Sequence, residues 1–110
     1  MELWILRIDM YNEWAAENGA CTLLGIYDKR YKAIRELEKN LNIEKEQGFI
    51  IEDNENIGDI INNINDSTST VNYVDVYCSK YGYDNGNSCS TYVLEKKILN
   101  TSTFKWKKTI

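Results

Sequence analysis

The sequence predicts an α+β protein with a small antiparallel sheet of four to five strands, covered on one face by one long and one short helix. Near both ends of the 110-residue chain, apolar and polar residues alternate, which is the pattern of a strand with one buried face. Between these segments, residues 28–41 carry apolar side chains at helical spacing. An Asn-Gly pair between two β-rich runs indicates a hairpin. The length fits one domain, residues 1–110.

The first two strands are expected at residues 3–10 and 21–27. In the first, alternate residues form an apolar face, whose members are Trp4, Leu6, Ile8 and Met10. The second, from Cys21 to Tyr27, is apolar on both faces, which is typical of an interior strand. We expect it to pair antiparallel with the first strand and to bury Cys21.

A helix of about three turns should follow, opened by the side chain of Asp28 as a cap. Its apolar side chains fall on one stripe that would cover the sheet: Tyr31, Ile34, Leu37 and Leu41. Residues 48–51 have the composition of a short strand. A shorter amphipathic helix opened by Asn54 or Asn56 is expected next, with Ile57, Ile60, Ile61 and Ile64 on one side.

The hairpin is expected between Val71 and Leu99, with Asn85 and Gly86 as its two loop residues. This register places Tyr73 opposite Ile98, Tyr77 opposite Leu94, Tyr81 opposite Ser90 and Tyr83 opposite Ser88. The tyrosines would then share one face with Tyr92, Leu94 and Ile98, while Val74, Val76, Cys78 and Val93 share the other. Residues 104–108 alternate in character and are expected to add an edge strand, protected by lysines.

The chain lacks the residues of the common catalytic and metal sites. It has no histidine, which removes the commonest general base and the commonest neutral metal ligand. Its three cysteines have no close spacing, so free thiols in a reducing cytoplasm are expected. Residues 53–58 resemble a calcium loop, but isoleucines stand at two ligand positions. We therefore predict a soluble, cytoplasmic protein that is not an enzyme, has no cofactor or metal, and does not enter a membrane.

Charge is polarised along the chain, although the net charge is only −4. Residues 44–66 hold seven acids and one lysine, whereas the stretch from Glu95 onward holds five lysines and one acid. The acidic stretch is interpreted either as a solvated face or as a surface that docks on a basic groove of another protein. The leading hypothesis is protein binding through this surface and exposed aromatic residues. The candidate contact residues are Glu52, Asp53, Glu55, Asp59, Tyr81, Tyr83 and Trp14.

A second hypothesis is single-stranded nucleic-acid binding through the C-terminal lysines, Trp106 and the tyrosine face. The negative net charge argues against it, because phosphate contacts dominate such affinity. A third hypothesis, binding of a small ligand in a pocket between helix and sheet, has no motif in its favour.

Several segments resemble a family of short uncharacterised bacterial and phage proteins. They are the strand ending Leu24-Gly25-Ile26-Tyr27, the basic helix with Ala33 and Leu37, and the late strand at residues 92–99. The resemblance implies an α+β fold. In general character the chain, small, acidic and free of catalytic motifs, is also similar to phage inhibitors of bacterial defence, such as anti-CRISPR proteins. Together with the acidic stretch, this makes a host protein with a basic groove the expected partner. The richness in Asn, Ile, Lys and Tyr points in the same direction, to a low-GC coding sequence.

Overall fold

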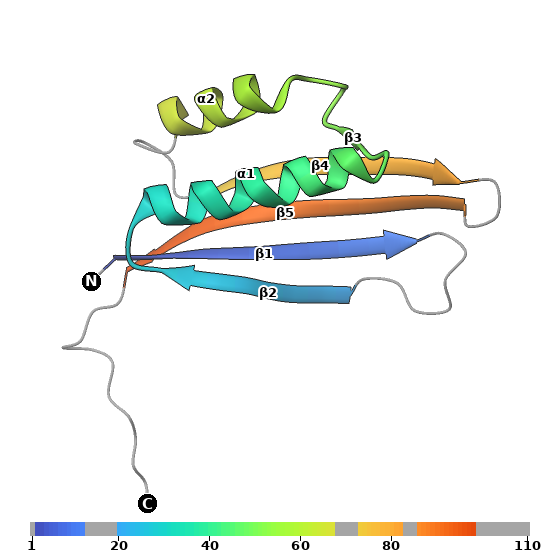
Figure 1. Cartoon of the computed structure of the whole chain (residues 1–110). Coiled ribbons are helices and arrows are strands. Elements are labelled where there is room, and N and C mark those ends of the chain that lie inside the picture. Colours follow the sequence, from blue (N-terminus) through green and yellow to red (C-terminus); the bar gives the residue numbers. More distant parts are fainter. Residues whose placement is uncertain (1, 13–19, 68–72, 83–85, 99–110) are drawn as a thin grey trace, which may run out of the picture.

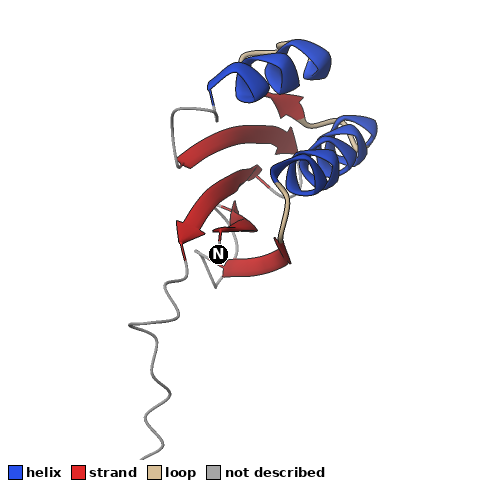
Figure 2. Cartoon of the chain, turned by 90° about the vertical axis from the view of Figure 1, so that its left-hand side faces the viewer, coloured by secondary structure: helices blue, strands red, loops and turns tan. Residues whose placement is uncertain are grey.

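A five-stranded antiparallel sheet with two helices on one face forms the molecule (Figures 1 and 2). The structure is a computed structural model, and it describes residues 2–12, 20–67, 73–82 and 86–98. The elements in chain order are β1 (Glu2–Asn12), β2 (Ala20–Tyr27), α1 (Arg30–Glu46), β3 (Ile50–Ile51), α2 (Ile57–Ser67), β4 (Tyr73–Gly82) and β5 (Gly86–Ile98). The strand order is β2-β1-β5-β4-β3. The predicted fold class is confirmed.

The core lies between the sheet and the helices. Cross-strand partners point to the same side of a sheet, and two adjacent rows of them are closed to solvent or nearly so. One row joins Leu6, Leu94 and Val74, and the next joins Ile8, Tyr92 and Val76. The predicted apolar face of β1 is thus confirmed for Trp4, Leu6 and Ile8, while Met10, near the end of the strand, is 41% exposed.

Both helices bury the side chains that their spacing predicted, apart from Tyr31. Helix α1 buries Ile34, Leu37 and Leu41, and α2 buries all four of its isoleucines. The predicted cap at Asn56 is confirmed, because its Oδ1 accepts the Asp59 N–H at 3.3 Å. The predicted cap at Asp28 is wrong. Its carboxylate accepts a hydrogen bond from Lys32 at 3.0 Å, and α1 begins after Lys29 without a side-chain cap.

One polar pair lies between α1 and the sheet. Tyr92 donates its hydroxyl hydrogen to Glu44 Oε1 at 2.8 Å. Burial and this hydrogen bond raise the pKa of Tyr92. Glu44, the first acid of the acidic stretch, therefore makes a contact inside the molecule.

The hairpin register differs from the predicted one by three positions. Tyr77 faces Thr91 instead of Leu94, and Gly82 faces Gly86, so the connection holds three residues where the sequence predicted two. A shift by an odd number moves one strand's side chains to the other face. Tyr92 and Leu94 consequently join Val76 and Cys78 in the core, and the tyrosines of β4 lie on the opposite face.

Strand β2 is an edge strand, which corrects the prediction of an interior one. Among the described residues it pairs with β1 alone, at one end of the strand order β2-β1-β5-β4-β3. Leu23 and Ile26 are 57% and 54% exposed, and Cys21 is exposed as well. In this protein, a strand with apolar residues on both faces is therefore not a central strand of the sheet.

The sheet face away from the helices, which we call the open face, carries polar contacts and exposed rings. Arg7 pairs with Glu95 at 2.9 Å, and Lys97 pairs with the same carboxylate at 3.0 Å. Tyr77 and Tyr81 are 44% and 65% exposed there. Neither helix is long and apolar enough to span a bilayer, as judged over the described part of the chain.

Candidate functional site

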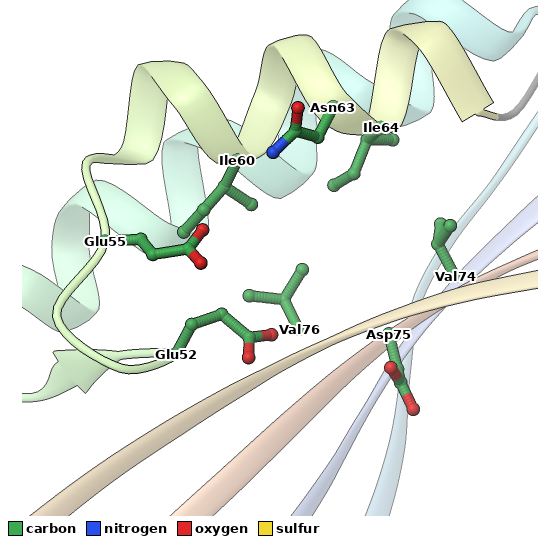
Figure 3. A pocket seen from close by; sticks show the side chains of 8 residues that line it. All are labelled: Glu52, Glu55, Ile60, Asn63, Ile64, Val74, Asp75 and Val76. Atoms are coloured by element: carbon green, nitrogen blue, oxygen red, sulfur yellow. The ribbon is translucent and has the colours of Figure 1, made fainter.

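A cleft of about 290 Å³ lies between α2 and β4 (Figure 3). Its apolar floor and wall come from α2 and from the helix-side face of β4, and its polar groups come from the β3–α2 connection, α2 and β4. The lining residues are Glu52, Glu55, Ile60, Asn63, Ile64, Val74, Asp75 and Val76. The cleft is thus apolar at its base, with carboxylates at one end.

The cleft exists because β3 is only two residues long. It pairs with Cys78 and Ser79 of β4, and the chain then turns away from the sheet. Glu52 marks the turn with a left-handed backbone, φ 54°, which is uncommon for a residue with a Cβ. The N–H groups of Asn54 and Glu55 donate to the carbonyl of Ile51 at 3.0 and 3.2 Å and complete the turn.

Glu52 is the last residue of this connection that bonds to the edge of β4, and it does so with both its main chain and its side chain. Its N–H donates to the Tyr77 carbonyl at 2.6 Å, and its Oε1 accepts the Tyr77 N–H at 2.9 Å. The carboxylate thereby replaces the carbonyl that a continuing strand would supply. Past Tyr77, toward Tyr73, no strand of the described residues pairs with this edge.

Two carboxylates face the space under α2. Glu52 and Glu55 both point into the cleft, on the side of Ile60 and Val76, whereas the side chain of Asp75 points to the other side of β4 (Figure 3). The main chain of Asp75 therefore borders the cleft. Among the described residues, no group of three or more cysteine or carboxylate side chains is placed to hold a metal ion. The pair is suited instead to the charged head of an organic cation, such as an ammonium or guanidinium group.

The structure divides the predicted contact residues among three places. Glu52 and Glu55 both line the cleft. Asp53 and Asp59 are exposed and do not line it. Tyr81 lies on the open face, near the far end of β4. Tyr83 and Trp14 lie outside the described residues.

Sequence reasoning missed four apolar residues and two polar ones in the cleft. Ile60, Ile64, Val74 and Val76 were expected only as packing residues. Their spacing shows which face of α2 and which face of β4 is apolar, but it does not show that a cleft lies between these two faces. Asn63 and Asp75 carry no signal of their own, because only the tertiary arrangement places them beside Glu52 and Glu55.

Two of the three thiols, Cys21 and Cys78, have raised pKa values. All three cysteines are free. Burial raises the pKa of Cys78 to about 12, and a hydrogen bond with Asp9 raises the pKa of the exposed Cys21. A nucleophilic cysteine needs a lowered pKa. Cys78, from its apolar strand pattern expected to serve packing, is buried in the core, whereas the predicted burial of Cys21 is wrong because β2 is an edge strand.

The lysine-rich stretch is only partly within the described residues. Lys96 pairs with Glu2, and Lys97 pairs with Glu95, both at 3.0 Å. Residues 104–108, the predicted edge strand, lie outside the described part. These ion pairs lower the positive charge that Lys96 and Lys97 present to a phosphate.

Comparison of the chain with protein-family models, with curated proteins and with solved structures finds no match. The fold and the cleft therefore define the protein by geometry. It is an antiparallel α+β protein with an acid-lined cleft between its second helix and one edge of its sheet.

Proposed function

We propose that this chain is a non-enzymatic protein-binding module and that the cleft between α2 and β4 receives a basic segment of its partner. One observation carries the proposal: Glu52 and Glu55 face a common space between two apolar walls, with Ile60 on one and Val76 on the other. Lysine and arginine combine an apolar stem with a charged head. A cleft with apolar walls and two carboxylates matches both parts of such a side chain.

The charge around the cleft supports the same partner. Asp53 and Asp59 are exposed on the connection and on the first turn of α2. They add negative potential near the cleft without lining it, and such potential raises the rate of encounter with a basic surface. Residues 44–66 hold seven acids and one lysine, so the surface of the partner that meets them is expected to be positively charged.

We further propose that the partner is a host protein with a basic groove, such as a nucleic-acid-binding defence protein, and that the chain inhibits it by occupying that groove. An acidic surface in a basic groove competes with phosphate for the same cations. The resemblance to phage inhibitors of bacterial defence supports this choice. Direct single-stranded nucleic-acid binding is less favoured, because Lys96 and Lys97 are already paired with Glu2 and Glu95.

The test uses two double variants with equal change in charge. Immobilised wild-type protein, the E52Q/E55Q variant and the D53N/D59N variant are each exposed to a lysate of a low-GC bacterium, and the retained proteins are identified by mass spectrometry. Glutamine keeps the acceptor that Glu52 offers to Tyr77, so the first variant removes charge without removing that bond. We expect E52Q/E55Q to lose the specifically retained protein.

The D53N/D59N variant should retain most of that protein, because neither residue lines the cleft. Equal retention by wild type and E52Q/E55Q, or no protein retained specifically by wild type, would contradict the proposed function.

A further inference from the structure

At the outer edge of β4 beside the cleft, backbone groups that no described strand pairs with follow a predictable order. In an antiparallel strand, the N–H and C=O of one residue point to the same side, and successive residues alternate sides. The N–H and C=O of Tyr77 both bond to Glu52, on the β3 side. Tyr73 and Asp75 therefore point their N–H and C=O outward, where no strand of the described residues lies.

This edge is long enough for a short added strand and is set under α2. Helix α2 lies on the β4 side of the sheet (Figure 1), and Ile60 and Ile64 face Val76 and Val74 across the cleft (Figure 3). A strand laid along Tyr73–Val76 would continue the line of β3. Its side chains would alternate between the cleft and the open face.

We propose that the partner's basic segment binds as an added antiparallel strand on the Tyr73–Val76 edge of β4, with a basic side chain and an apolar side chain two residues apart in the cleft. The proposal rests on the proposed function and specifies how the segment is held. Addition of a strand to an exposed edge is a general mode of peptide recognition, in which main-chain bonds supply affinity and pockets for alternate side chains supply specificity.

The cleft determines the order of the two side chains. Glu52 and Glu55 lie at the end near Val76, and Ile64 lies at the end near Val74 (Figure 3). The basic residue therefore stands opposite Val76 and the apolar residue opposite Val74. Because an antiparallel partner runs against β4, the segment reads basic, any residue, apolar from its N-terminus.

The middle residue of the segment stands opposite Asp75 and makes the diagnostic contact. Its N–H donates to the Asp75 carbonyl, and its C=O accepts the Asp75 N–H. Its side chain points to the open face, where Tyr77 is exposed and the Asp75 side chain points (Figure 3). A threonine suits this position, because it favours strands and offers a hydroxyl to the carboxylate.

The probe is an amidated octapeptide, Thr-Ser-Thr-Arg-Thr-Val-Thr-Ser, which carries fluorescein on its N-terminal amine and is titrated with the full chain in anisotropy measurements. A second peptide carries an N-methyl group on the threonine between Arg and Val. A third exchanges Arg and Val. We expect the first to bind, and each of the other two to bind about tenfold more weakly, as the loss of one buried hydrogen bond or one charge contact implies.

Two variants of the chain test the same bond from the other side. D75P removes the outward N–H and leaves the bonds to β5, which Val74 and Val76 make; proline is tolerated on an edge strand when its missing N–H faces outward. D75A removes the carboxylate but keeps the N–H. We expect about tenfold weaker binding for D75P and a change within about threefold for D75A.

Amide exchange of wild-type protein, followed by NMR, reports the contact without any substitution: exchange of the Asp75 and Tyr73 amides should slow on peptide binding. Lack of binding by the octapeptide at up to about 1 mM, a dissociation constant that would represent about 4 kcal/mol, would overturn the proposal. Equal affinity of the N-methyl or exchanged peptide would also overturn it. Loss of binding in E52Q/E55Q together with indifference to N-methylation would leave the proposed function standing and reject only the added strand.

Discussion

Similar residues are buried on one face of the sheet and exposed to solvent on the other. Leu6 and Leu23 lie in adjacent strands, yet Leu6 is fully buried under the helices, whereas Leu23 is 57% exposed on the open face. The helix-covered face is closed by aliphatic side chains together with Trp4 and Tyr92, while the open face has the Arg7–Glu95 ion pair and exposed rings around the buried Val93. What a residue contributes to stability here depends on which face the register gives it more than on its hydrophobicity.

Two of the cysteines show the same difference in burial between the two faces of the sheet. Cys78 is fully buried on the helix-covered face, and Cys21 is exposed on the open face. Both pKa values are raised, but by different causes: burial acts on Cys78, and a hydrogen bond with Asp9 acts on Cys21. Matched substitutions on the two faces therefore measure the difference between them directly.

The largest expected difference is between Leu6→Ala and Leu23→Ala. The first substitution leaves a cavity in a closed core and should lower the free energy of unfolding by about 2–5 kcal/mol. The second removes a side chain that is more than half in water and should change it by less than about 0.5 kcal/mol. Urea denaturation followed by circular dichroism measures both. Similar losses in the two variants would show that the open face is covered in solution.

A smaller difference should appear in alkaline solution between Cys78 and Cys21. Because the pKa of Cys78 is raised from 9.0 to about 12, the folded state keeps a proton that the unfolded chain has lost. The stability it contributes is present below pH 9 and is lost as the pH rises toward 12. Between pH 8 and pH 10, wild type should lose about 1–2 kcal/mol more stability than Cys78→Ala.

The matched variant Cys21→Ala should keep the steeper pH dependence of wild type, because this thiol is exposed in the folded state. Denaturant titrations at the two pH values test the difference. A C78A variant with the same pH dependence as wild type would assign the alkaline loss to other groups, such as Tyr92.

The smallest effect is expected from the ion pair of the open face. Hydrogen bonds with Lys97 and Arg7 lower the pKa of Glu95, so its contribution is present near neutral pH and is lost as the pH falls through that lowered value. Glu95→Gln should cost less than about 1 kcal/mol at pH 7. The cost should shrink further in about 0.5 M salt, which screens partly exposed charges.

Asp53→Asn, at an exposed carboxylate of the β3–α2 connection, is the matched control for this measurement. It should leave stability within about 0.5 kcal/mol of wild type. A loss for Glu95→Gln that persists in high salt would show that the Arg7–Glu95 pair is more shielded from water than its exposure indicates.

Local pattern was sufficient for most elements. Alternation in β1 and helical spacing in α1 and α2 located their buried residues correctly apart from Met10 and Tyr31, because those patterns record which side of an element avoids water. The two-residue hairpin loop was wrong, because an Asn-Gly pair indicates a turn without excluding a three-residue connection. Apolar residues on both faces of β2 were misleading, because the neighbours of a strand are not written in its own sequence.

The candidate site was predicted only at Glu52 and Glu55. Acidic composition identified the stretch that holds them, but it did not distinguish them from Asp53 and Asp59, which do not line the cleft. The difference arises from the left-handed turn at Glu52 and from the short β3. Val74, Val76 and Asp75 joined the site through the packing of α2 above β4, which links residues far apart in the chain.

The sequence by itself determined the α+β class, the apolar faces of β1, α1 and α2, and the negative charge of residues 44–66, since each follows from periodicity or composition within a few turns of chain. Only the tertiary structure decided which sheet face is covered, which strand lies at the edge, and that two of the acids line a cleft beside a strand edge that no described strand pairs with. Strand order and register depend on long-range pairing, and the free energy of that pairing is shared among residues that no local pattern connects.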